Sequence, residues 1–124
     1  MEYSKDILIS GAPADTAGVM FDPARETEWM TCVTASVPQT AGIQRGAEVK
    51  RTSTVDGAEV AWSTVVEQFH FPHVLKLKIS GSQSGYIYYE VQRYAGGTIA
   101  KVRAESDQDL FGFDLEKLKT MVER

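Results

Sequence analysis

The sequence predicts an α+β domain, with a curved antiparallel sheet of about six to seven strands, two short N-terminal helices and one C-terminal helix. Apolar residues recur with a helical period only near the two ends of the chain, and with period two in between. The turns between the expected strands are too short for parallel crossovers. A sheet of this size with helices on one side is an α+β arrangement. The 124 residues contain no repeat and no linker, so we expect one domain over residues 1–124.

The N-terminal third predicts one strand followed by two short helices. Residues 4–10 alternate as a first strand. Pro13 suits the first position of a helix, where its missing N–H has no helical partner. Pro23 ends that helix because it biases the preceding residue away from helical angles. A second short helix is expected over residues 24–30.

The middle of the chain predicts consecutive antiparallel strands. Asp56-Gly57 is a hairpin signal, and Pro72 closes a long strand. Apolar residues at 75, 77 and 79 alternate with polar ones, which is typical of a half-buried strand. The expected strands span residues 33–40, 48–55, 58–71, 75–80, 86–94 and 98–105.

The helical period returns at the C-terminus. Phe111, Leu115, Leu118 and Val122 form one apolar stripe, which predicts a closing helix of roughly 14 residues from Leu110.

Composition and charge limit the classes of partner. Thirteen Lys and Arg against 17 Asp and Glu give a net charge of -4, the opposite of what a nucleic-acid binder needs. Cys32 is the only cysteine, so no intramolecular disulfide can form. The N-terminus lacks a signal-peptide pattern, and no apolar run reaches membrane-spanning length. We therefore expect a cytoplasmic protein without nucleic-acid partners or integral membrane association; residues 33–40, at a sheet edge, could pair in a homodimer.

Several short motifs, in order, resemble the START/Bet v1-like superfamily, also called SRPBCC or polyketide cyclase/dehydrase-like proteins. The resemblance rests on their order and spacing over nearly the whole chain. The motifs are Ile9-Ser10-Gly11-Ala12-Pro13-Ala14-Asp15, Phe21-Asp22-Pro23, Trp29, residues 42–46, Pro72-His73-Val74-Leu75, residues 97–105 and residues 113–119.

The resemblance implies a helix-grip fold, in which the curved sheet and the last helix enclose a hydrophobic cavity. The sequence departs from the family at two places. Gly18 replaces a usually bulky helix residue, and the closing helix is shorter than the family's. How far this helix closes the cavity is therefore left open.

Aromatic and aliphatic side chains are the candidate lining of such a cavity, with filling of the core as the alternative role for each. On the tyrosine strand, Tyr86 and Tyr88 share one face while Tyr89 lies on the other, and a buried Tyr hydroxyl needs a polar partner. The candidate ligand-binding residues are Trp29, Trp62, Phe69, Phe71, Leu75, Leu77, Tyr86, Tyr88, Phe111 and Leu115.

Few residues could act in acid–base chemistry. The candidates are Tyr88, Glu90, His70 and Arg103, of which Glu90 could instead pair with Lys101 or Arg103 on an outward face. Arg51, like Arg103, could point inward and hold a ligand carboxylate or enolate.

Cofactors and metals are not expected. His70 and His73 face opposite sides of a strand, which argues against a shared metal. Glu26 is interpreted as a helix-terminal charge and Cys32 as a small buried hydrophobe. No Ser-His-Asp spacing, phosphate loop or Cys-His cluster is present.

Three functions are compatible with these observations. The favoured one is binding of a small hydrophobic or lipid-like ligand in an internal cavity. The second is a cofactor-independent cyclase or dehydratase, which the family resemblance implies and which requires at least two of the acid–base candidates in one cavity. The third is a protein-interaction module like the related activators of a chaperone ATPase.

Overall fold

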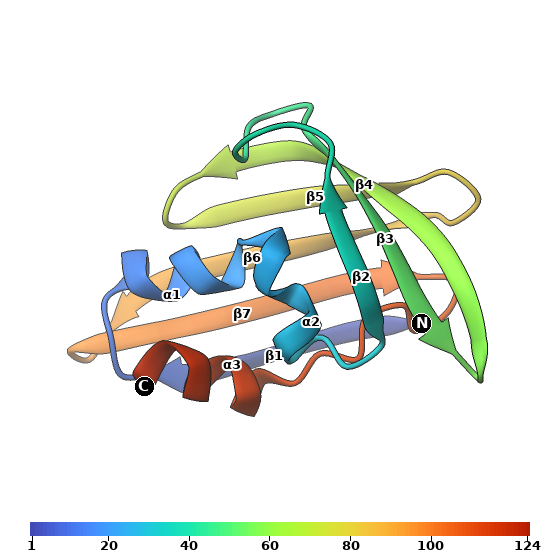
Figure 1. Cartoon of the computed structure of the whole chain (residues 1–124). Coiled ribbons are helices and arrows are strands. Elements are labelled where there is room, and N and C mark those ends of the chain that lie inside the picture. Colours follow the sequence, from blue (N-terminus) through green and yellow to red (C-terminus); the bar gives the residue numbers. More distant parts are fainter.

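A computed structural model describes residues 1–124 as a seven-stranded antiparallel sheet that curves around its helices (Figure 1). Neighbouring strands follow the order β1-β7-β6-β5-β4-β3-β2. The two sheet edges are thus β1 and β2. The strands are β1 (Glu2–Ile9), β2 (Val33–Pro38), β3 (Glu48–Val55), β4 (Ala58–His70), β5 (Val74–Ser80), β6 (Gly85–Tyr94) and β7 (Gly97–Ser106).

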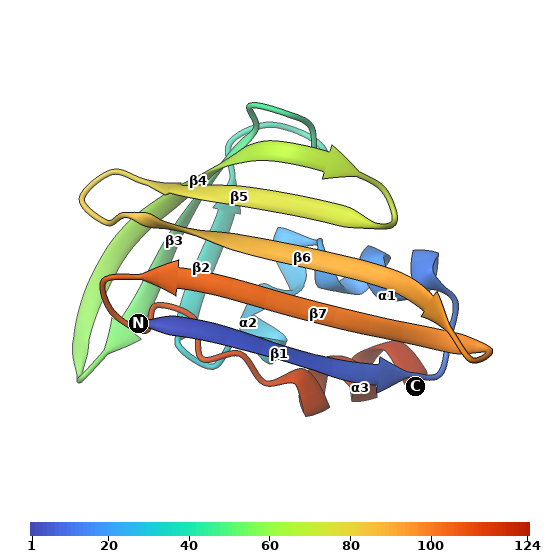
Figure 2. The same ribbon diagram turned by 180° about the vertical axis from the view of Figure 1, so that it is seen from behind.

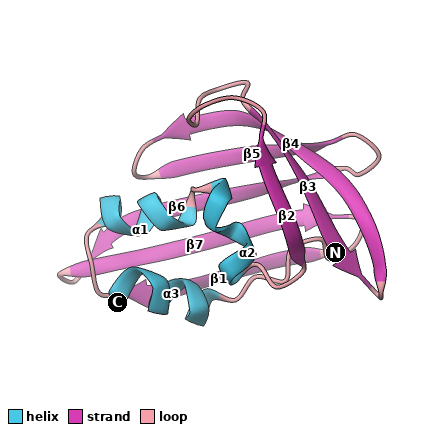
Figure 3. Cartoon of the chain, viewed as in Figure 1, coloured by secondary structure: helices cyan, strands magenta, loops and turns pink.

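All helices lie on the concave side of the sheet, as Figure 3 shows. They are α1 (Pro13–Met20), the short 3₁₀ helix η1 (Pro23–Arg25), α2 (Glu26–Trp29) and α3 (Leu115–Glu123). α1 packs against β6 and β7, while α3 packs against β1, α1 and α2. The convex side carries no helix (Figure 2). The predicted α+β architecture is confirmed.

Local chemistry explains where these elements begin and end. Pro13 occupies the first turn of α1, as predicted, and the Asp22 carboxylate accepts a hydrogen bond from the Ala24 backbone N–H at 2.9 Å, which caps η1. Asp56 and Gly57 both have positive φ, the conformation of a type I′ turn, and join β3 to β4 as a tight hairpin.

The closing helix is shorter than predicted. It begins at Leu115 rather than Leu110 because the preceding residues are held as extended chain. The backbone N–H groups of Thr31 and Cys32 donate to the carbonyls of Gly112 and Phe111, at 2.7 and 3.1 Å. Phe111 therefore enters the core from an extended segment, not from a helix.

The hydrophobic core lies between the concave face of the sheet and the helices. Trp29, Phe111 and Leu118 are fully buried there, together with the inward side chains of β5, β6 and β7. No helix of the chain has the length and apolar character that crossing a membrane requires.

Candidate functional site

An open apolar pocket lies on the concave side, between α1, residues 38–43 and the Phe69–Phe71 end of β4. Its free volume is about 620 Å³. We call it the mouth. Its lining is Ala17, Gly18, Phe21, Asp22, Pro23, Pro38, Thr40, Ala41, Gly42, Ile43, Phe69 and Phe71.

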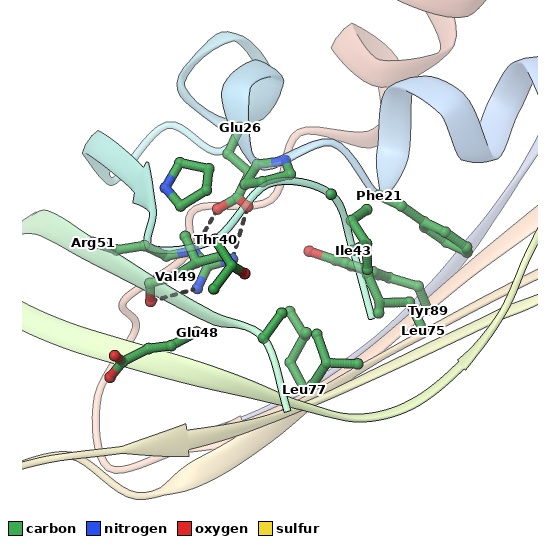
Figure 4. Close-up of a pocket in the computed structure, with 15 residues that line it drawn as sticks. Phe21, Glu26, Thr40, Ile43, Glu48, Val49, Arg51, Leu75, Leu77 and Tyr89 are labelled. Atoms are coloured by element: carbon green, nitrogen blue, oxygen red, sulfur yellow. Dashed lines mark hydrogen bonds and ion pairs between the residues drawn. The ribbon is translucent and has the colours of Figure 1, made fainter. Parts of the chain in front are cut away.

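A much smaller inner pocket continues from the mouth toward the sheet (Figure 4). The two share six lining residues, among them Phe21 and Ile43. The free volume of the inner pocket is about 20 Å³, enough for one water molecule. Its walls combine the apolar side chains of Val66, Leu75 and Leu77 with polar groups from Glu26, Arg51 and Tyr89.

Two local features of the sequence shape the mouth. Gly18 contributes no side chain, and a Cβ added there would meet no atom within 4 Å. In β4, the register shifts between Val66 and Gln68, which marks a β-bulge. The extra residue lets Phe69 share the inner face with Val66 although the two are three positions apart. Phe21, Phe69 and Phe71 then form an aromatic wall, with ring centroids 6.3–6.5 Å apart.

A buried ion pair forms the polar wall of the inner pocket. Arg51 donates to Glu26 through two nitrogens, Nε at 2.6 Å and Nη2 at 2.8 Å. Its Nη1 donates to the Thr64 hydroxyl and to the Val49 carbonyl. The guanidinium carbon also lies 5.1 Å from the centre of the Trp62 ring. Arg51 points inward, as considered above, but Glu26 already neutralises its charge.

Tyr89 supplies a hydroxyl to the same pocket. The residue is only 2% exposed, and its ring stacks on Phe21 with centroids 6.0 Å apart. The hydroxyl donates to the Met30 sulfur at 3.9 Å. Burial raises the pKa of this hydroxyl well above its usual value, and the nearby negative charge of Glu26 adds to the effect. The hydroxyl therefore stays protonated.

Four of the predicted ligand-binding residues contact this site. Phe69 and Phe71 line the mouth, and Leu75 and Leu77 line the inner pocket. Four others lie in the packed core and line neither pocket, each at most 3% exposed: Trp29, Trp62, Phe111 and Leu115. Trp62 and Phe111 pack edge to face at 5.6 Å, and the Trp62 indole N–H donates to the Ser53 hydroxyl at 2.8 Å. They fill the core, which was the alternative role.

The placement of Tyr86 and Tyr88 in a cavity is wrong. β6 turns the opposite face inward, where Ile87, Tyr89 and Val91 are buried. Tyr86 lies on the convex side, with the Lys76 ammonium 6.0 Å from its ring centre. The alternating pattern of β6 predicted Tyr86 and Tyr88 on one face and Tyr89 on the other, but it did not show which face the helices cover.

The acid–base candidates do not converge in a cavity. Tyr88 donates to Glu90 at 3.2 Å on the convex side, and the Glu90 carboxylate lies 3.8 Å from the Lys101 ammonium. The outward alternative for Glu90, pairing with Lys101, is the one observed. His70 and Arg103 are exposed and line neither pocket.

The histidines and the cysteine also lie away from the site. The Nδ1 of His73 lies 2.8 Å from the Val91 carbonyl. Cys32 is partly exposed, and burial raises the pKa of its thiol. Nowhere in the chain do three or more His, Cys, Asp or Glu side chains gather as metal ligands would.

Sequence reasoning missed most of the residues that line the site, although one available signal pointed to part of it. Arg51 lies at an inward position of an alternating strand, and a buried cation requires an anionic partner. That partner is Glu26, which is 4% exposed, so its interpretation as a mere helix-terminal charge is wrong. The missed residues include Phe21, Glu26, Pro38, Ile43 and Tyr89.

Comparison of sequences finds no match: no family model matches the chain, and neither does any curated protein. Comparison of structures finds many. CV1439 from Chromobacterium violaceum superposes with a TM-score of 0.74 over 99% of this chain and 97% of that chain, at 12% identity. Ara h 8.0201, a Bet v1 allergen, gives 0.68 over 98% and 97%, also at 12% identity. This chain has the Bet v1-like fold.

Part of a protein from a biosynthetic pathway also superposes on this chain. The di-domain ARO/CYC StfQ from the steffimycin biosynthetic pathway matches with a TM-score of 0.69 and 12% identity, over 86% of this chain and 37% of that one. At sequence identities of 12%, similarity to these structures establishes the fold alone. The chemistry of the site must be argued from the residues of this chain.

Proposed function

We propose that this chain binds a small hydrophobic or lipid-like molecule in the mouth and the inner pocket. The observation that carries the proposal is the apolar mouth of about 620 Å³ on the concave side of the sheet. Small-molecule sites are typically concave, mostly apolar and roughly 300–1,000 Å³ in volume. A few polar groups that orient the ligand are equally typical, and here Glu26, Arg51 and Tyr89 lie at the inner end.

The exposure of Phe71 supports an apolar ligand. This ring is 53% exposed although it lies against Phe21 and Phe69 in the mouth wall. Covering apolar surface stabilises a complex by roughly 25 cal/mol per Å². A ligand seated in the mouth would remove the exposed face of Phe71 from water.

The enzyme alternative receives less support from the same geometry. It requires at least two of the candidates Tyr88, Glu90, His70 and Arg103 in one cavity. Tyr88, Glu90 and Arg103 lie on the other side of the sheet, and His70 is exposed and lines neither pocket. The cavity instead contains a neutralised ion pair and a protonated tyrosine hydroxyl. These groups can orient a ligand, so binding is the function that we put forward.

Filling the mouth tests this function. The variant Gly18→Phe places a large side chain where an added Cβ meets no atom, and replacing glycine in a helix improves helix propensity. We expect the variant to fold and to bind a neutral fluorescent probe such as Nile red at least about tenfold more weakly than the wild type. Fluorescence titration gives both affinities.

The matched control is Gly18→Ala, which leaves the mouth open and should keep wild-type affinity. If Gly18→Phe binds the probe as tightly as Gly18→Ala, the mouth is not the binding site. If the wild-type protein binds no apolar probe, the proposed function is wrong.

A further inference from the structure

The Tyr89 hydroxyl has an unusual environment for a buried polar group. Its hydrogen-bond partner is the sulfur of Met30, which is a weak acceptor, and no donor reaches its oxygen. Buried hydroxyls in native proteins normally have a good partner, either protein or ordered water. Figure 4 shows this hydroxyl pointing toward the centre of the pocket, next to Ile43.

The space beside this hydroxyl fits a single oxygen atom. The inner pocket has about 20 Å³ of free volume, and an ordered water needs at least roughly 10–15 Å³ and two to four polar partners. Tyr89 and Glu26 both line this pocket and offer such partners. Arg51 has protein acceptors for four of its five N–H groups, which leaves one N–H of Nη2 for a further acceptor.

The charge balance of the pocket disfavours an anion. Glu26 already neutralises Arg51 through two short contacts, at 2.6 and 2.8 Å. A ligand carboxylate would therefore lie beside the Glu26 carboxylate without a free cation, and burying an unpaired charge is costly. An uncharged hydroxyl or carbonyl oxygen has no such penalty.

We propose that the inner pocket receives one uncharged oxygen of the ligand, so that the preferred ligands are neutral apolar molecules that end in a hydroxyl or carbonyl group. This inference rests on the proposed function and narrows its ligand class. The apolar body of the ligand occupies the mouth, and its single polar group fills the space beside Tyr89. Fatty acids and other carboxylates are disfavoured.

Three compounds of one shape test the inference: biphenyl, para-phenylphenol and biphenyl para-carboxylate, each competing with Nile red at neutral pH. A net hydrogen bond contributes roughly 0.5–1.5 kcal/mol, so we expect the phenol to bind about three- to tenfold more tightly than biphenyl. We expect the carboxylate to bind at least about tenfold more weakly than the phenol.

Two tyrosine variants assign the preference to a residue. Tyr89→Phe should reduce the ratio between phenol and biphenyl affinities toward one. Tyr88→Phe, which removes a hydroxyl from the convex side of the same strand, should leave that ratio at its wild-type value.

The outcomes separate this inference from the proposed function. Equal binding of biphenyl and phenol by the wild type, or tightest binding of the carboxylate, overturns the inference while the hydrophobic site stands. A preference that survives in Tyr89→Phe also overturns it. Failure of all three compounds and of Nile red to bind overturns the proposed function itself.

Discussion

The two halves of the concave face differ in what covers them. At the end of the concave face that carries Trp62, the segment before α3 places Leu110 and Phe111 in the core. Both side chains are fully buried, and the Phe111 ring packs against Trp62. Over Leu75 and Leu77, the cover consists of residues 21–26, which follow α1, and the segment between β2 and β3. This cover leaves the inner pocket, which continues into the mouth beside α1. The same curved sheet thus builds a packed core at one end and an open pocket at the other.

The two halves differ because α3 is short and because Gly18 has no side chain. α3 begins only at Leu115 and packs against β1, α1 and α2, so it does not extend under β4 and β5. Gly18 adds no side chain to the gap that remains. Of the two departures from the family pattern noted in the sequence, Gly18 lines the mouth, whereas no residue of the short closing helix does.

The largest contrast between the halves concerns stability. Phe111→Ala should reduce the free energy of unfolding by about 3–5 kcal/mol, because it creates a cavity in a close-packed region. Phe71→Ala in the mouth should reduce it by only about 1 kcal/mol, because that ring is half exposed and contacts only the mouth wall. Chemical denaturation measures both; similar losses would show that the mouth is packed like the core.

Arg51 lies between the packed half and the open half of the concave face, since its guanidinium lies over the Trp62 ring and it also lines the inner pocket. Arg51→Met should reduce the free energy of unfolding by about 3 kcal/mol, because it leaves the Glu26 carboxylate buried without a partner. Adding Glu26→Gln should restore part of this loss, because the charge is then gone. Denaturation of the single and double variants checks this, and additive losses would contradict the buried pair.

Much of the fold could be predicted, because its signals are local. Pro13 starts α1 and Asp56-Gly57 turns the first hairpin, since each acts through its own backbone geometry. The bounds of β3 agree with the prediction. The closing helix was overestimated because the apolar spacing of Phe111 and Leu115 fits a helix, whereas hydrogen bonds to residues 31 and 32 hold Phe111 in extended chain.

The site was harder to predict because its residues meet only through tertiary packing. Glu26 and Arg51 are 25 positions apart and lie on a helix and a strand. Tyr88 and Tyr89 are chemically identical neighbours, and only the covering helices decide which of them is buried. The bulge in β4 shifts the alternation, which is why Phe69 and Trp62 both face inward despite their odd spacing.

A smaller effect sharpens the comparison by testing whether bulk water is kept out of the inner pocket. The pKa of Tyr89 is raised above its ordinary value of 10.0 in the folded state, mainly by burial. Above about pH 10, the unfolded chain therefore loses this proton while the folded chain keeps it, and stability falls as the pH rises, by at most about 1.4 kcal/mol per pH unit. Tyr89→Phe lacks this contribution, so the wild type should lose stability relative to the variant between about pH 9 and about pH 11.

Denaturation of both proteins at the two pH values measures this difference. Other groups that titrate in the same range contribute equally to both proteins and cancel in the comparison. A stability difference that does not change with pH would mean that bulk water reaches the Tyr89 hydroxyl.

The central claim is that the open half of the concave face, and not the packed half, holds the ligand. Backbone amide NMR spectra recorded while para-phenylphenol is added test it most directly. The account predicts shifts concentrated at Gly18, Phe21, Gly42 and Ile43, with Trp62 and Phe111 unaffected. Shifts centred on Tyr86 and Tyr88 of the convex face, or no shifts at saturating ligand, would contradict it.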